Sequence, residues 1–288
     1  MMRIALPNKG RLAEGALELF ERAGLRAEFR AERALVAKLG SDFQAIFVRA
    51  QDIPEFVADG VAELGVTGRD LVAESNRSEI GELLDLGFGR CRLIVAVRDE
   101  SSIKEPGQLA AGTRVATSFP NVSTGFFQGL GIPIQVVPVS GAAEIAPHLG
   151  VADVIVDLAS TGSTLQVNGL REIGTILEST ALLVGSTSAL GTEDAQQTTR
   201  ELVTALESVL RAREKRYLMS NVPRDRLDEV RTVVPGISGP TVVDVLDRET
   251  WVAVHAVVDA DAVYQTIARL KALGAEGILV TRIERLMS

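Results

Sequence analysis

A seven-residue pattern that occurs twice constrains the fold of this chain more than any other feature. Residues 60–66, Gly-Val-Ala-Glu-Leu-Gly-Val, return at 150–156 as Gly-Val-Ala-Asp-Val-Ile-Val. A second echo pairs Arg-Ile-Ala at 3–5 with Arg-Val-Ala at 114–116, and a Pro-Asn step follows each copy. Because the two echoes keep the same order, they predict two lobes of similar structure.

Strand-like runs alternate with amphipathic helical runs through about residue 185. The strand-like runs 3–6, 43–49 and 64–66 precede the helical runs 11–23, 54–59 and 70–75, respectively. This alternation predicts α/β layers with mainly parallel strands. Two such lobes form a cleft at the carboxyl ends of their strands, where open α/β sheets bind ligands. We therefore expect a two-lobed body like that of periplasmic binding proteins.

After residue 191 the pattern becomes that of a smaller module. Residues 193–213 read as one long helix with an apolar stripe. Strand, helix, two strands, helix and strand follow over residues 217–283, an order typical of a ferredoxin-like βαββαβ unit. The predicted division is a first lobe of residues 1–90 and 184–215, a second lobe of residues 91–183, and a regulatory domain of residues 216–288.

Composition narrows the possible partners. The formal net charge of −8 argues against a nucleic-acid binder, because duplex affinity depends on basic patches. One cysteine, Cys91, and two histidines argue against an internal disulfide or a zinc site, and we interpret Cys91 as a core residue. No signal-like segment and no run of about 18 apolar residues occurs. We expect a cytoplasmic protein that binds neither membranes nor nucleic acids.

The strongest local motif lies at residues 154–165, where an apolar strand reaches Asp157 and enters a loop of hydroxyls and glycine. We call the segment that contains Ser160, Thr161, Gly162, Ser163 and Thr164 the phosphate loop. Its small residues allow a ligand to approach the backbone, and its N–H groups and the helix that follows favour an anion. Asp157 is placed to accept hydrogen bonds from ribose hydroxyls. The alternative is an ordinary helix start with a Ser or Thr cap.

The motif resembles the phosphoribosyl-pyrophosphate loop of phosphoribosyltransferases. With Glu144 and the lead-in at 150–153, it is similar to the signature of the ATP phosphoribosyltransferase family. Residues 6–12 and 65–71 resemble two further loops of that family. The regulatory domain of the family's long form is similar to this chain at residues 217–219, 235–236, 240–241 and 270–275. The resemblance thus covers essentially the whole chain.

Two residues depart from the general phosphoribosyltransferase loop. Leu158 stands where many relatives have a second acid, and Ser163 stands where they have glycine. With one carboxylate missing, we do not expect side chains of this loop to bind both ribose hydroxyls.

The resemblance also implies the residues of the site. Its catalytic candidates are Lys9, Arg49, Arg69 and Asp157, the three cations following strand ends where they would neutralise a polyphosphate. Its substrate-binding candidates are Arg11, Gly68, Asp70, Phe119, Ser160, Thr161, Gly162, Ser163 and Thr164. Three of these keep a simpler alternative: a surface charge for Arg11, a helix cap for Asp70 and core packing for Phe119.

The reaction implied by the resemblance joins ATP to phosphoribosyl pyrophosphate in the first step of histidine biosynthesis. N1 of ATP attacks C1 of the phosphoribosyl group and expels pyrophosphate, with Mg²⁺ on the leaving phosphates. No protein nucleophile is needed, so catalysis comes from alignment and charge stabilisation.

For the C-terminal domain the resemblance implies feedback inhibition by histidine. The residues that match the ligand-contacting stretches are Asn221, Ile237, Thr241 and Gly277. Asn221 stands where some relatives have an acid, and Thr241 has the alternative of an ordinary strand residue. The family also suggests a homo-oligomer, a dimer or a hexamer.

Two other readings explain part of the pattern. A two-lobed solute-binding protein would have the repeat and the cleft without catalysis, but the chain shows no export signal. A prephenate-dehydratase-like enzyme would join a two-lobed body to a regulatory domain. It gives no reason for the spacing of Asp157, Thr161 and Thr164.

Overall fold

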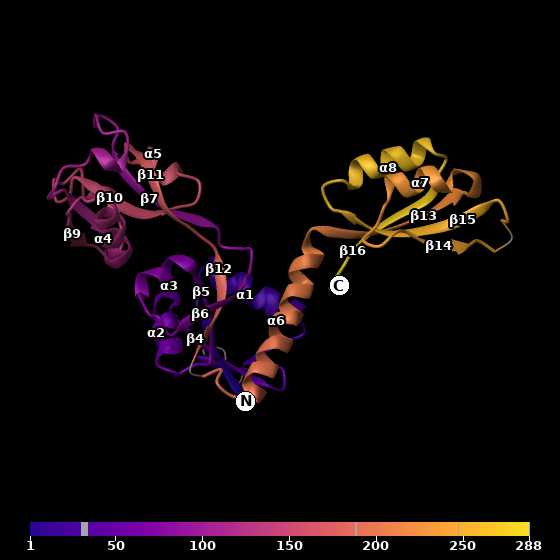
Figure 1. Ribbon diagram of the computed structural model, residues 1–288, viewed down its shortest axis with the longest axis horizontal. Helices are drawn as coiled ribbons and strands as arrows, with labels where there is room; N and C mark the ends of the chain where they lie inside the picture. The colour runs from indigo at the N-terminus through magenta and orange to yellow at the C-terminus, as the bar shows by residue number, and fades with distance from the viewer. Residues whose placement is uncertain (30–33, 188, 247, 288) are drawn as a thin grey trace. The chain divides into compact units, whose positions relative to one another are not determined.

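The computed structural model describes residues 1–29, 34–187, 189–246 and 248–287. They form two compact units, Met1–Val203 and Thr204–Ser288 (Figure 1). The first unit contains two mixed sheets and the second contains one antiparallel sheet. The predicted fold class, a two-lobed α/β body followed by a βαββαβ module, is confirmed. No helix in these ranges is both long enough and apolar enough to cross a membrane.

The first lobe is built on a seven-stranded sheet. In spatial order its strands are β2 (Ala27–Phe29), β3 (Val36–Leu39), β4 (Phe43–Val48), β1 (Met2–Pro7), β5 (Leu64–Gly68), β12 (Ala181–Ser186) and β6 (Ile80–Asp85). The central strands β4, β1 and β5 are parallel. Its helices are α1 (Arg11–Arg22), η1 (Ala50–Asp52), α2 (Ile53–Ala58) and α3 (Arg69–Ser75). Because helices cover the sheet, β1 is apolar and buried at Ile4, Ala5 and Leu6.

The second lobe is built on a five-stranded sheet. In spatial order its strands are β11 (Leu170–Ser179), β7 (Cys91–Arg98), β10 (Val154–Ala159), β8 (Arg114–Thr117) and β9 (Gln135–Pro138). Strands β10, β8 and β9 are parallel, whereas β7 is antiparallel to both of its neighbours. Its helices are η2 (Pro106–Gln108), α4 (Pro120–Gly129), η3 (Ala143–Ile145) and α5 (Ser163–Val167). The chain enters this lobe after β6 and returns to the first sheet through β12 (Figure 1).

The internal repeat appears in the structure as the same set of hydrogen bonds in both lobes. The Arg3 backbone N–H donates to Glu63 Oε2 at 2.7 Å, and the Arg114 N–H donates to Asp153 Oδ2 at 3.0 Å. Each guanidinium also binds its acid and the carbonyl of the glycine three residues before it. In each lobe the repeat therefore marks an ion pair that joins the starts of two neighbouring parallel strands, β1 and β5 in the first lobe and β8 and β10 in the second.

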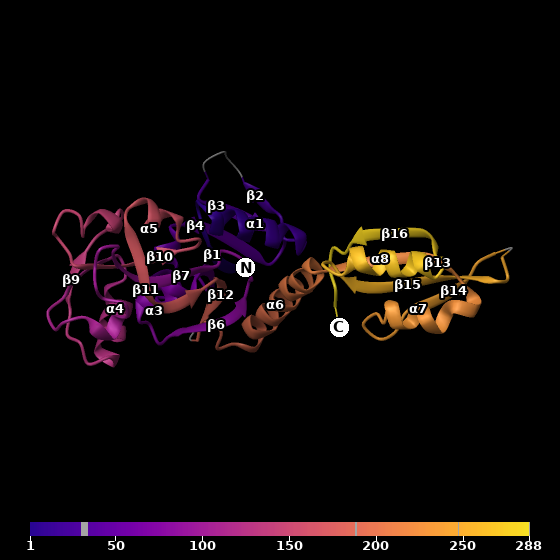
Figure 2. The same ribbon diagram turned by 90° about the horizontal axis from the view of Figure 1, so that it is seen from above.

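The long helix α6 (Glu193–Arg213) runs across the border of the two units. The C-terminal unit then consists of β13 (Lys215–Pro223), η4 (Arg224–Arg226), α7 (Leu227–Val233), β14 (Thr241–Asp244), β15 (Trp251–Asp259), α8 (Val263–Ala272) and β16 (Glu276–Arg282). Its strand order is β14-β15-β13-β16. Alternate residues of β13 and β15, such as Leu218 and Val254, are buried with the helices, and both helices lie on one face of the sheet (Figures 1 and 2).

Candidate active site between the two lobes

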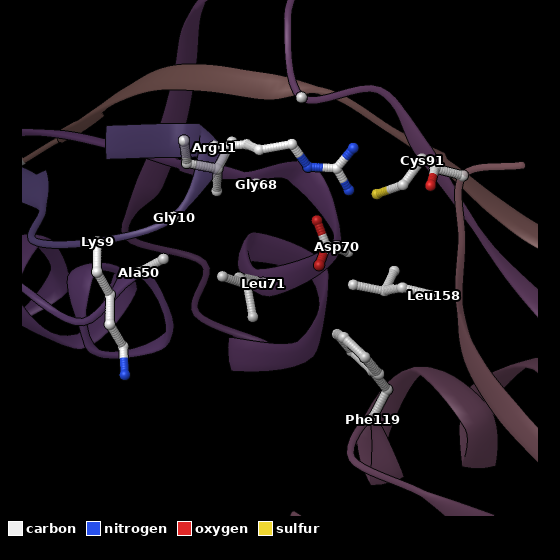
Figure 3. Close-up of a pocket in the computed structure, with 13 residues that line it drawn as sticks. Lys9, Gly10, Arg11, Ala50, Gly68, Asp70, Leu71, Cys91, Phe119 and Leu158 are labelled. Atoms are coloured by element: carbon white, nitrogen blue, oxygen red, sulfur yellow. The ribbon is translucent and has the colours of Figure 1, made fainter. Parts of the chain in front are cut away.

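A cavity of about 350 Å³ opens between the two lobes of the first unit (Figure 3). Most of its residues follow directly after the ends of β1, β5, β8 and β10, so it lies at the carboxyl ends of strands from both sheets. The lining residues are Lys9, Gly10, Arg11, Leu12, Ala50, Gly68, Asp70, Leu71, Gly89, Cys91, Phe119, Leu158 and Ser160. Six predicted site residues thus meet here: Lys9, Arg11, Gly68, Asp70, Phe119 and Ser160.

The first lobe contributes the charged groups of this cavity. Lys9 and Arg11 are exposed; Lys9 lies in the turn between β1 and α1, and Arg11 is the first residue of α1. In Figure 3 the Arg11 guanidinium points toward Asp70 and Cys91, whereas the Lys9 side chain points away from them. Two cations on one wall, at different positions along it, suit an extended anion better than a point charge.

Asp70 is the most constrained polar group of the cavity. It is only 5% exposed, and its Oδ1 accepts a hydrogen bond of 2.5 Å from the Ser179 hydroxyl. The Asp70 N–H donates in turn to Ser179 Oγ at 3.0 Å. A Cβ on Gly68 would lie 2.2 Å from Asp70 Oδ1, so this conformation needs glycine there. The N-cap residue of α3 is Gly68, and the Asp70 carboxylate lies in the first turn of that helix.

The apolar lining of the cavity consists of Leu71 of the first lobe and, facing it in Figure 3, Phe119 and Leu158 of the second lobe. Phe119 is 5% exposed and belongs to the core of the second lobe, so it packs in the core and also lines the cavity. Burial, together with the nearby Asp70, raises the pKa of the Cys91 thiol. Cys91 therefore stays protonated at neutral pH and is a poor nucleophile.

A second cavity of about 380 Å³ shares Cys91 and Ser160 with the first. Arg69 lines this second cavity, where its guanidinium lies 3.4 Å from Glu82 and 3.5 Å from Asp85. Arg90 and Arg92 lie beside it. Arg69 thus lines the second cavity, whereas Lys9 and Arg11 line the first.

Arg49 does not line either of these cavities. It is exposed and directly precedes η1, whose first residue, Ala50, does line the first cavity.

Asp157 lies half-buried near the end of β10. Its Oδ1 accepts a hydrogen bond of 2.7 Å from the Leu158 N–H. Burial raises the pKa of Asp157, and the negative charge of Glu144 raises it further, against the lowering by the Leu158 N–H. Glu144, in η3, is therefore a neighbour of Asp157 that sequence reasoning had used only as part of a signature. The pattern alone gave no signal of this proximity.

Within the phosphate loop, Ser160 lines both cavities while the remaining members lie outside them. The Thr161 hydroxyl lies 3.0 Å from Ser163 Oγ, and Thr164 stays exposed in α5. Gly162 adopts φ 75°, a conformation that favours glycine, immediately before α5. The loop consequently presents several hydroxyls beside the cavity.

The four effector candidates fall into two places in the C-terminal unit. Asn221 and Thr241 lie on the sheet face away from α7 and α8. Asn221 Nδ2 would lie 3.7 Å from a Cβ placed on Gly277, so these two residues are neighbours. Ile237 is 62% exposed and lines a different cavity of about 330 Å³, beside α8.

No group of three or more His, Cys, Asp or Glu side chains within the described ranges is arranged to hold a metal ion.

Known proteins resemble this chain over its full length. The profile of the HisG family, described as ATP phosphoribosyltransferase, matches residues 49–208, and that of the HisG C-terminal domain matches residues 212–285. Proteins named ATP phosphoribosyltransferase are 61% identical over 292 residues in Gemmatimonas aurantiaca and 47% identical over 288 residues in Methanopyrus kandleri. Both alignments cover all of both chains.

A solved structure agrees with these matches. The ATP phosphoribosyl transferase (HisG:HisZ) complex from Thermotoga maritima contains a chain that aligns with a TM-score of 0.62 and 27% identity. The alignment covers 72% of this chain and 99% of that chain.

Proposed function

The chain belongs to the ATP phosphoribosyltransferase family, which performs the first step of histidine biosynthesis, and we propose that the cleft between its lobes is the active site. The observation that carries this proposal is a single cavity lined both by Ser160 of the phosphate loop and by Lys9 and Arg11 of the opposite lobe. Each lobe thus offers groups for one of the two anionic substrates.

Phosphoribosyl pyrophosphate binds on the second lobe in this proposal. The phosphate loop holds the 5-phosphate through hydroxyls and backbone N–H groups. Asp157 and Glu144 accept hydrogen bonds from the ribose hydroxyls. Glu144 thus takes the role of the second acid that many relatives carry at the position of Leu158. The support is the electrostatic proximity of the two carboxylates.

ATP binds against the first lobe. Its adenine lies between Leu71 of the first lobe and Phe119 and Leu158 of the second, which form the apolar lining of the cavity. Asp70 accepts a hydrogen bond from the exocyclic amine of adenine, because Ser179 fixes one carboxylate oxygen and leaves acceptor capacity on the other. Lys9, Arg11 and Arg49 bind the triphosphate.

In the reaction, N1 of adenine forms a bond to C1 of ribose while the bond from C1 to the pyrophosphate oxygen breaks. Pyrophosphate leaves with that electron pair. The cations stabilise its charge, and Arg69, which lines the adjoining cavity, contributes to this stabilisation. Holding two substrates in line supplies much of the remaining rate enhancement.

Magnesium fits this site as a companion of the substrate phosphates. A Mg²⁺ ion commonly keeps several waters and takes its other ligands from phosphate oxygens and one or two carboxylates, so it needs no dedicated cluster of protein ligands. In this proposal the ligands of the ion are the substrate phosphates and water. When bound, the ion would neutralise the departing pyrophosphate.

An absorbance assay tests the proposed reaction. Substitution at N1 changes the ultraviolet spectrum of adenine, so absorbance should change only when ATP, Mg²⁺ and phosphoribosyl pyrophosphate are all present. A solute-binding protein or a prephenate-dehydratase-like enzyme would leave the spectrum unchanged. Mass spectrometry identifies the product as phosphoribosyl-ATP.

Glu144→Gln should raise the KM for phosphoribosyl pyrophosphate about tenfold and leave the KM for ATP within about twofold. The loss of one charged hydrogen-bond acceptor costs roughly 1.5 kcal/mol, which corresponds to this factor. Steady-state kinetics with each substrate varied in turn measures both constants. Glu105→Gln, at an exposed position of the same lobe, is the control. Equal changes in both KM values would remove Glu144 from the ribose site.

We also propose that histidine inhibits this enzyme through the C-terminal unit, and that the chain works as a homo-oligomer in the cytoplasm. The support is the family match over residues 212–285 and the proximity of Asn221 to Gly277. In this proposal the ammonium group of histidine lies near the side-chain amide of Asn221, at a position where some relatives have a carboxylate.

Asn221→Asp should therefore tighten inhibition by histidine about fivefold. A carboxylate attracts the effector's ammonium group and contributes about 1 kcal/mol at a partly exposed site. Inhibition curves at fixed substrate concentrations measure the effect, and Gln135→Glu on an exposed strand of the second lobe adds the same charge elsewhere as a control. If Asn221→Asp left the inhibition unchanged, the effector would bind away from Asn221.

A further inference from the structure

The helix α4 of the second lobe begins without a cap of its own. Its N-cap residue, Phe119, makes no side-chain cap hydrogen bond, and Pro120 has no N–H. The next two N–H groups, of Asn121 and Val122, have no partner within the helix because the first turn of a helix lacks preceding carbonyls. Their acceptors must come from outside α4.

Glu74 of the first lobe supplies both acceptors. Its Oε1 accepts a hydrogen bond of 2.9 Å from the Asn121 N–H, and its Oε2 accepts one of 3.0 Å from the Val122 N–H. The Asn121 side-chain amide donates in return to the Glu74 carbonyl oxygen at 2.8 Å. A carboxylate at this end also matches the positive pole of the helix. We call this set of three hydrogen bonds the Glu74 clamp.

The clamp joins the two helices that carry opposite walls of the cavity. Glu74 lies three residues after Leu71 and four after Asp70 on α3, which places all three on one side of that helix. On the other side of the cavity, Phe119 directly precedes the clamped turn. Leu71 also packs against the core of the second lobe. The distance between Leu71 and Phe119 is thus tied to the hydrogen bonds of Glu74.

We infer that Glu74 is a positioning residue, which sets the separation of the two lobes so that the substrates meet in line. This inference rests on the proposed function of the cleft. Glu74 does not line the cavity and contacts no substrate in the proposed arrangement. Because the phosphates of each substrate are held by its own lobe, loosening the clamp changes the mutual alignment of the substrates more than the binding of either one. A misplacement of about 1 Å can cost up to about 100-fold in rate.

Kinetics of the full-length chain separates positioning from binding. Glu74→Ala should lower kcat about tenfold while both KM values stay within about twofold. Glu74→Gln keeps the side-chain length and one acceptor oxygen, so its kcat should fall between those of Glu74→Ala and the unchanged protein. Glu18→Ala is the matched control, since Glu18 is exposed on α1 with its basic partner Arg22 at 3.9 Å. It should leave kcat unchanged.

Hydrogen–deuterium exchange tests the clamp without using activity. The Asn121 and Val122 amides should be protected in the unchanged protein, although first-turn amides usually are not, and they should exchange at least about tenfold faster in Glu74→Ala. Unaltered exchange, or faster exchange with an unchanged kcat in both Glu74 variants, would overturn the inference. If the protein without any substitution formed no phosphoribosyl-ATP, the proposed reaction would be refuted instead. The exchange experiment does not depend on that reaction.

Discussion

Replacing Thr161 and Thr164 together with alanine should weaken the binding of phosphoribosyl pyrophosphate about 100-fold and leave the binding of ATP within about twofold. Both hydroxyls lie in the phosphate loop on the second lobe, and Thr164 is exposed in α5. A hydrogen bond to a charged group contributes about 1.5 kcal/mol or more, so two lost bonds give roughly this factor. Calorimetric titration with each substrate separately measures the two affinities.

The control for this double variant is Thr232→Ala with Thr250→Ala, two exposed threonines of the C-terminal unit. It should bind both substrates normally. An equal loss of affinity for ATP and phosphoribosyl pyrophosphate in the phosphate-loop variant would contradict the division of the cleft into one substrate for each lobe.

Asp157→Asn should lower kcat/KM for phosphoribosyl pyrophosphate about 100-fold and at the same time stabilise the folded chain at neutral pH. The activity falls because an amide is a weaker acceptor than a carboxylate for hydroxyl groups of the ribose. The stability rises because burial, and the neighbouring Glu144, make the ionised carboxylate unfavourable in the folded state.

The sign of the pH dependence follows from the raised pKa of Asp157. The folded state holds this proton at a pH where the unfolded state has already lost it, so stability decreases as the pH rises from the ordinary aspartate pKa through the raised one. Asp157→Asn lacks this decrease. Thermal unfolding of both proteins at a series of pH values should give similar melting temperatures at acidic pH. As the pH rises, the melting temperature of Asp157→Asn should increasingly exceed that of the unsubstituted protein. Parallel curves would show that Asp157 is not destabilised by its surroundings.

Much of the fold follows from local patterns in the sequence. The repeat at 60–66 and 150–156 predicts two similar lobes, because each copy carries the acid that pairs with an arginine at the start of the neighbouring strand. The helix α6 and the βαββαβ order are equally visible, since their apolar periodicity is regular. The antiparallel direction of β7 and β11 cannot be predicted from local patterns, because it depends on the side from which the chain re-enters the sheet.

The site was harder to predict for a physical reason. Sequence motifs mark residues at strand ends, but they do not determine which of two adjoining cavities a long side chain enters. Arg69 follows β5 as expected, yet its guanidinium pairs with Glu82 and Asp85 of β6 and lies in the second cavity. The proximity of Glu144 to Asp157 and the clamp from Glu74 to α4 depend on tertiary contacts between segments far apart in the chain.

A crystal structure with phosphoribosyl pyrophosphate and Mg²⁺ bound tests the central claim most directly. We predict the 5-phosphate against the backbone N–H groups and hydroxyls of residues 160–164, with a carboxylate oxygen of Asp157 within hydrogen-bond distance of a ribose hydroxyl. Electron density for the sugar phosphate at another place in the chain, with this loop unoccupied, would contradict the account.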